Sequence, residues 1–126
     1  MPVKHLDHVN IHTRQMAETI RFYSELLGLK VGVTPGRSDT SMSAWLYDEG
    51  GRPIVHLGTP KGDGPEAPPG SGRIDHVAFE CSGHDETAQR LTEWGLPFRR
   101  REVAEVKLRQ LFVRDPNDIM VELNFR

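Results

Sequence analysis

Histidine and glutamate are the residue types in this sequence whose spacing points to chemistry, because imidazole and carboxylate groups together bind divalent metal ions. His8 stands in the segment LDHV (6–9), and His76 stands in the closely similar segment IDHV (74–77). A lone histidine in a strand is usually satisfied locally or exposed to solvent, but a repeated context argues for a shared role. We therefore predict that His8 and His76 are metal ligands.

His56 and Glu122 form a second matched pair. The segments LYDEGGRPIVHL (46–57) and FVRDPNDIMVEL (112–123) both read as a strand, a turn and a strand. Laid on each other without gaps, they place His56 on Glu122. We predict that Glu122 is a metal ligand, and that His56 is either a fourth ligand or an acid–base group beside the metal.

These pairs indicate that the chain contains two copies of one module. Each copy reads as strand, helix, strand, strand, strand, which predicts an α+β fold of two tandem βαβββ modules. Apolar residues recur at helical spacing in 17–28 and in 85–95, and each segment ends in a glycine that can cap a helix. The strands are predicted at 3–12, 30–34, 41–48, 53–59, 73–82, 98–103, 108–114 and 119–125.

The length favours one domain over residues 1–126. We predict a first module at 1–59, a linker at 60–72 that is rich in proline and glycine, and a second module at 73–126.

Side chains alternate between the two faces of a strand, so each candidate ligand shares a face opposite the apolar residues. His56 is flanked by Val55 and Leu57, and Glu122 is flanked by Val121 and Leu123. The apolar faces should pack on the helices. If the modules meet about a pseudo-twofold axis, all four candidates surround one point. The aspartates before His8 and His76, Asp7 and Asp75, are expected to point away from the metal.

Composition excludes several other classes of function. The net charge of −2 gives no general electrostatic basis for binding nucleic acid or an anionic membrane. The run from Arg99 to Arg101 is read as a solvated strand end, with an anionic substrate tail as the alternative. Cys81, the single cysteine, is read as a small core residue. We find no signal sequence and no stretch long enough for a membrane helix, so we expect a cytoplasmic protein.

LDHVNI, the helix ending FYSELLGL, IDHVAF and the closing QLFVRDPNDIMVELNF together resemble the vicinal oxygen chelate superfamily, which includes glyoxalases, bleomycin resistance proteins and extradiol dioxygenases. The resemblance implies a half-open mixed β-barrel around one divalent ion, which could be Fe, Ni, Co, Zn or Mn. Carried over, the family's ligand positions are His8, His56, His76 and Glu122, with Glu122 and His56 as catalytic candidates. It also implies a homodimer and a small substrate with adjacent oxygens.

The resemblance leaves three functions open. An extradiol-dioxygenase-like oxidoreductase is favoured slightly, with three protein ligands and His56 as an acid–base group. A glyoxalase I-like lyase or an epimerase acting by metal-assisted enolisation is the first alternative. A non-catalytic antibiotic-binding protein is the second, although such members generally lack the metal ligands. The substrate, the ion, the role of His56 and the subunit origin of the ligands stay open.

Overall fold

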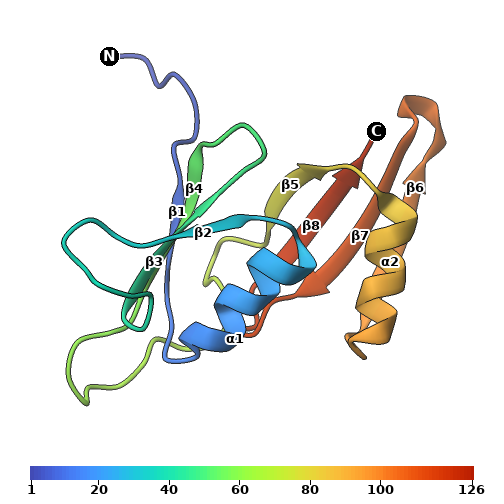
Figure 1. Ribbon diagram of the computed structural model, residues 1–126. Helices are drawn as coiled ribbons and strands as arrows, with labels where there is room; N and C mark the ends of the chain where they lie inside the picture. Colours follow the sequence, from blue (N-terminus) through green and yellow to red (C-terminus); the bar gives the residue numbers. More distant parts are fainter. The chain divides into compact units, whose positions relative to one another are not determined.

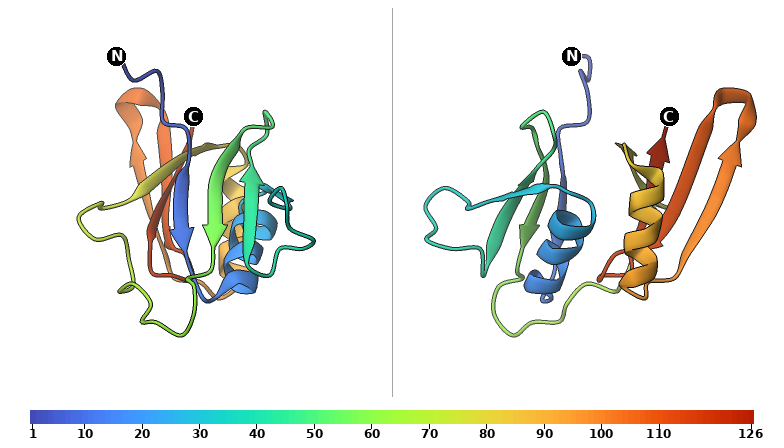
Figure 2. Two further views of the ribbon diagram at one scale, coloured as in Figure 1. Left: turned by 90° about the vertical axis from the view of Figure 1, so that its left-hand side faces the viewer. Right: turned by 45° about the vertical axis from the view of Figure 1, so that its right-hand side comes forward.

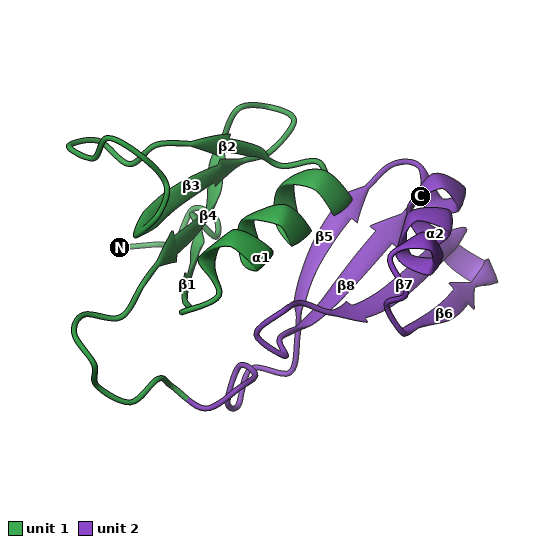
Figure 3. Cartoon of the chain, turned by 60° about the horizontal axis from the view of Figure 1, so that its bottom comes forward, with its two compact units in different colours: residues 1–67 green, residues 68–126 purple.

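The computed structural model describes residues 1–126, which divide into two compact units, Met1–Ala67 and Pro68–Arg126 (Figure 3). The boundary between the units falls within the predicted linker at 60–72. The prediction that both units make up one domain stays a prediction.

Unit 1 contains one open four-stranded sheet and one helical segment (Figure 1). The strand order is β1-β4-β3-β2, with β1 parallel to β4 and the other neighbours antiparallel. Its elements are β1 (Val9–His12), α1 (Met16–Arg21), the π-helical turn η1 (Phe22–Leu26), β2 (Lys30–Gly32), β3 (Ser43–Tyr47) and β4 (Pro53–Gly58).

Unit 2 repeats this topology. Its sheet has the order β5-β8-β7-β6, with β5 parallel to β8 and the other neighbours antiparallel (Figure 2). Its elements are β5 (Val77–Cys81), α2 (His84–Glu93), β6 (Phe98–Val103), the 3-10 turn η2 (Ala104–Val106), β7 (Leu108–Arg114) and β8 (Met120–Phe125). The predicted α+β fold of two βαβββ modules is therefore confirmed.

Two strand starts differ from the prediction by four residues or more. β1 begins at Val9 and β5 begins at Val77, so His8 and His76 each lie immediately before a strand. The helix ends agree with the prediction: Gly28 and Gly95 have positive φ angles of 81° and 70°. This left-handed conformation is the usual glycine cap of a helix.

Alternate residues of the central strands form the buried faces. In unit 1, Val55 and Leu57 are fully buried, together with Tyr23 of η1. In unit 2, Val121 and Leu123 are fully buried, and α2 contributes His84, whose ring packs edge-on against Phe125 at 5.2 Å. The alternation leaves His56 and Glu122 on the opposite face of their sheets, as the sequence predicts.

The turns before β4 and β8 have a common design. The Oδ1 atom of Asp48 accepts a hydrogen bond from the backbone N–H of Arg52, and Asp115 Oδ1 does the same for Ile119. The fourth turn residue has positive φ in both, 83° at Gly51 and 63° at Asp118. Aspartate tolerates this conformation better than most residues.

The linker is fastened at both ends. The side chain of Arg14 donates hydrogen bonds to the carbonyls of Gly62 and Gly64, and the backbone N–H of Gly70 donates to Asn117. The first two contacts lie within unit 1 and the last within unit 2. Among the helices, none has the length and apolar character needed to cross a bilayer.

Candidate metal centre

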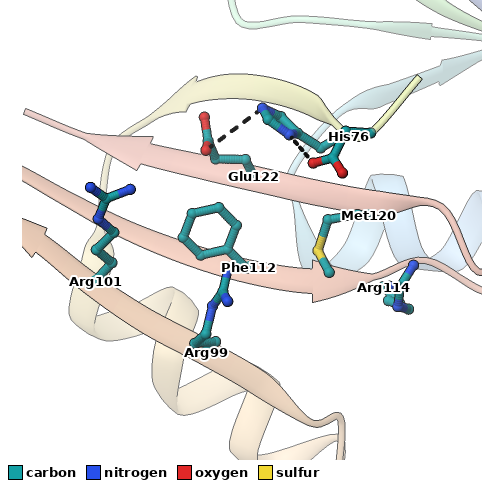
Figure 4. A pocket seen from close by; sticks show the side chains of 8 residues that line it. His76, Arg99, Arg101, Phe112, Arg114, Met120 and Glu122 are labelled. Carbon is teal, nitrogen blue, oxygen red and sulfur yellow. Dashed lines mark hydrogen bonds and ion pairs between the residues drawn. The ribbon is translucent and has the colours of Figure 1, made fainter. Parts of the chain in front are cut away.

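Unit 2 brings two of the four predicted ligands face to face. The Nε2 atom of His76 lies 3.8 Å from Oε1 of Glu122 (Figure 4). Two donors bound to one ion at roughly 2.0–2.2 Å can stand no more than about 4.4 Å apart. The spacing is longer than a hydrogen bond and within this limit, so the pair fits two ligands of one ion.

The aspartate before each histidine orients its ring. Asp75 Oδ2 lies 2.8 Å from Nδ1 of His76, and Asp7 Oδ2 lies 2.6 Å from Nδ1 of His8. The expectation that these aspartates point away from the metal stays a prediction, since each carboxylate contacts Nδ1, the ring nitrogen remote from Nε2. A carboxylate on Nδ1 leaves Nε2 free as a ligand and increases its basicity, an arrangement common around bound metals.

The same contact affects protonation of His76. The hydrogen bond that His76 donates to the Asp75 carboxylate raises the pKa of His76 above its usual value, and the negative charge of Glu122 acts in the same direction. Because a metal must displace the proton from Nε2, binding at this histidine should depend on pH.

A chain of amides fixes the Glu122 carboxylate. The amide of Asn124 donates to Oε2 of Glu122 at 3.1 Å, and the amide of the buried Gln110 donates to Oδ1 of Asn124 at 2.9 Å. The other side-chain atom of Gln110, Oε1, is buried without a hydrogen-bond partner. The amide chain leaves Oε1 of Glu122 directed at His76. Sequence reasoning did not select Asn124 as a contributor to the site, although Asn124 shares the face of Glu122.

Unit 1 brings together the other two predicted residues. The ring centroids of His8 and His56 are 6.5 Å apart, and Trp45 contacts both rings. The indole stacks flat on His56 at 4.2 Å and meets the edge of His8 at 4.9 Å. Trp45 is the neighbour of His56 across the β3–β4 ladder, and this register explains the stacking.

Both ring nitrogens of His56 are already engaged. Asn10 Nδ2 lies 3.0 Å from Nδ1, so the amide donates to that nitrogen and the ring proton resides on Nε2. This N–H faces Ser43 Oγ at 3.2 Å, and Ser43 in turn contacts Thr34 at 2.7 Å. His56 therefore offers no free lone pair in this arrangement, in contrast to His8 and His76.

Burial also keeps His56 neutral. Desolvation lowers the pKa of His56 below its usual value, and the neighbouring His8 and His12 act in the same direction. Burial likewise raises the pKa of the Cys81 thiol to about 11, so this cysteine is not a thiolate near neutral pH. That agrees with its reading as a packing residue.

Each unit thus supplies one pair of candidates. Neither unit alone gathers three His, Cys, Asp or Glu side chains in a group that could hold an ion. The convergence of His8, His56, His76 and Glu122 on one ion stays a prediction.

A pocket of about 340 Å³ opens beside the His76–Glu122 pair (Figure 4). It lies wholly within unit 2, and its floor includes Phe112 and Met120. The remaining lining residues are charged: Asp75, Arg99, Arg101 and Arg114. The reading of Arg99 to Arg101 as a solvated strand end was incomplete, because two of these arginines line the pocket. Residues alternate along β6, so Arg99 and Arg101 line the pocket whereas Arg100 contacts Phe98.

Residues 5–123 match the family model of the glyoxalase/bleomycin resistance protein/dioxygenase superfamily. A curated relative, the protein named glyoxylase I 4 of Arabidopsis thaliana, is 30% identical over 94% of this chain and 68% of its own length. The family-model match covers both units and all four candidate residues.

Solved structures agree in fold. A glyoxalase/dioxygenase from Nostoc punctiforme has a TM-score of 0.74 at 19% identity, covering 97% of this chain and 90% of its own. A lactoylglutathione lyase from Agrobacterium tumefaciens has a TM-score of 0.65 at 16% identity, covering 99% and 96%. At such identities the likeness concerns the fold alone.

Proposed function

Because this chain belongs to the glyoxalase/bleomycin resistance protein/dioxygenase superfamily, we propose that it is a metal-dependent enzyme acting on a small substrate with two adjacent oxygens. The observation that carries the proposal is the His76–Glu122 pair, whose two groups face each other at 3.8 Å. Each group has a separate partner on its far side, Asp75 for His76 and Asn124 for Glu122. Such oriented pairs are typical of metal ligands.

We propose His8, His76 and Glu122 as the protein ligands of one divalent ion. His8 supports this assignment through its aspartate contact, which repeats that of His76. Two imidazoles and one carboxylate suit Fe, Ni, Co, Zn or Mn. When bound, such an ion would act as a Lewis acid on the two substrate oxygens.

We propose a glyoxalase-like lyase or isomerase as the reaction class, ahead of the dioxygenase favoured by the sequence alone. The support is the 30% identical relative that carries a glyoxylase I name. In this reaction, Glu122 would give up its place as a ligand, and its Oε1 would accept a proton from a substrate carbon while Asn124 keeps Oε2 in place. Glu122 is mostly shielded, with 15% of its side chain exposed, and this limits competition from water.

A dioxygenase-like oxidoreductase is the second candidate, and one specific observation favours it. Both ring nitrogens of His56 are engaged by Asn10 and Ser43, so only three of the four candidates have a free ligand atom. Two histidines and one carboxylate are the ligand set of non-haem iron oxygenases. His56 would then be an acid–base group beside the substrate. A homodimer and a cytoplasmic location remain predictions from the family resemblance.

Metal analysis of protein purified without chelator tests the proposal. We expect about one equivalent of a first-row divalent ion per chain, its loss in His76→Ala, and its retention in the matched control His5→Ala. An ion retained in full by His76→Ala would refute the site. If the protein contains no metal, has no activity and binds an antibiotic, the result would instead support a non-catalytic binding protein.

The two reaction classes are separated on the same preparations. Nickel- or cobalt-loaded protein should convert a hemithioacetal, and this activity should be lost in Glu122→Gln. Oxygen uptake after catechol is added to the anaerobic Fe(II) protein, without lyase activity, would instead identify a dioxygenase.

A further inference from the structure

The pocket in unit 2 has an unusual distribution of charge. Three arginines line it, Arg99, Arg101 and Arg114, against the two carboxylates Asp75 and Glu122. Both carboxylates already have hydrogen-bond partners. Asp75 contacts Nδ1 of His76, and Glu122 accepts a hydrogen bond from the amide of Asn124. Neither carboxylate forms an ion pair with Arg99 or Arg101, because both are turned to these other partners.

The three arginines differ in their own contacts. Arg114 is paired with Asp118, whose carboxylate lies 3.5 Å away and whose carbonyl accepts at 3.0 Å. Arg99 lies over the ring of Phe112 at 4.6 Å, a cation–π contact that leaves its N–H donors free. Arg101 has no carboxylate partner within unit 2. Two guanidinium groups on one face of β6 are thus available to a ligand.

The sheet sets the distance between these groups and the candidate ligands. Phe112 of β7 lies opposite Glu122 of β8 on one side and opposite Arg99 of β6 on the other. Two strand spacings, roughly 10 Å at the backbone, therefore separate the row of Glu122 from that of Arg99. Figure 4 shows Phe112 between the His76–Glu122 pair and Arg99.

We propose that Arg99 and Arg101 form an oxyanion-binding subsite, and that the substrate carries a carboxylate or phosphate group several bonds away from its adjacent oxygens. The planar donors of arginine match both groups with paired hydrogen bonds. The apolar ring of Phe112 lies between the arginines and Glu122, where it would contact the middle of the ligand. The inference rests on the proposed function only in calling the bound anion a substrate.

Three compounds test the subsite in metal-free protein by calorimetric titration. Glycerol 3-phosphate and glycerate carry a phosphate or a carboxylate, and glycerol is the neutral control. We expect both anions to bind, glycerol not to bind, and the affinity for the anions to fall with added salt. Tighter binding of glycerol 3-phosphate identifies a phosphate substrate, and tighter binding of glycerate identifies a carboxylate.

Two matched variants assign the binding to residues. R99Q/R101Q should lose about tenfold or more in affinity for the anions, whereas R100Q, on the opposite face of the same strand, should stay within about twofold. If the double variant does not fold, as judged by circular dichroism, R101Q alone serves the same purpose. Equal losses in R100Q, binding of glycerol, or no binding of either anion would overturn the subsite.

The metal analysis above is independent of this titration. If the metal analysis finds no ion in the purified protein but the anions bind in the titration, the proposed function is refuted and the subsite stands. If an ion is found but neither anion binds, the subsite is refuted and the proposed function stands.

Discussion

Where unit 1 has Trp45 beside His56, unit 2 has Phe112 beside Glu122, and each pair spans the same two strands of its sheet. The neighbouring positions on the outer strand are Gly32 in unit 1 and Arg99 in unit 2. One backbone plan therefore presents a stacked neutral histidine in one unit and a carboxylate near a cation in the other.

The space above Gly32 shows how unit 1 differs. A Cβ atom on Gly32 would lie only 2.7 Å from the ring of Tyr47, so this ring covers the place where a larger side chain would stand. The residue matching Tyr47 in unit 2 is Arg114, which turns to Asp118 and lines an open pocket. Duplication preserved the strands and their buried faces, while the exposed faces diverged into an aromatic region and a cationic one.

The buried faces should respond alike when that comparison is tested. Leu57 and Leu123 occupy matching positions and are both fully buried. Replacing either by alanine should lower the free energy of unfolding by about 2–5 kcal/mol, measured by chemical denaturation. The control Leu6→Ala, at a side chain that is 74% exposed, should change it by no more than about 0.5 kcal/mol. A small effect at only one of the two leucines would contradict the equivalence of the cores.

The polar networks should respond differently. Asn124→Leu releases Glu122, and we expect it to weaken metal binding by about 10–100-fold in a competition assay with a chromophoric chelator. Ser43→Ala in unit 1 removes the contact to His56 and should leave the affinity unchanged within about threefold if His56 lies outside the ligand set. A marked change in Ser43→Ala would show that His56 binds the ion.

The smallest expected effect is a divergence in titration. In metal-free protein, His56 should titrate below 6.5 and His76 above 6.5, because burial lowers the pKa of the first and Asp75 raises that of the second. Ring signals in NMR spectra would measure both, with His56→Gln and His76→Gln for assignment. If the pKa values of both rings lay above 6.5, or both below it, the predicted difference between His56 and His76 would be wrong.

The two pKa shifts make the free energy of unfolding depend on pH in opposite directions. At His56 the unfolded chain binds more protons than the folded chain. The contribution of His56 to the free energy of unfolding is therefore present above pH 6.5 and is lost as the pH falls through the pKa of the folded state. For His76 the folded chain binds more protons, so its contribution is present below pH 6.5 and is lost as the pH rises through its folded pKa.

Much of this organisation could be predicted from local sequence. The strands near Val55 and Val121 alternate apolar and polar residues, and Gly28 and Gly95 end the helices, because both signals act over a few residues. The contacts of Asp7 and Asp75 with their neighbouring histidines were not predicted, because the strand parity was extended one residue too far. Arg99 and Arg101 were read as a charge run, although their spacing of two places them on one face.

The sequence by itself determined the duplicated βαβββ plan, the buried faces and the four candidate residues, since each follows from short-range periodicity or internal repetition. Only the tertiary structure decided that Asn10 and Ser43 engage both nitrogens of His56, and that Gln110 reaches Glu122 through Asn124. Apart from the contact of Asn124 with Glu122 inside one strand, these contacts join neighbouring strands of a sheet. They depend on the register of the ladders and on side-chain rotamers, which the pattern of a single strand does not specify.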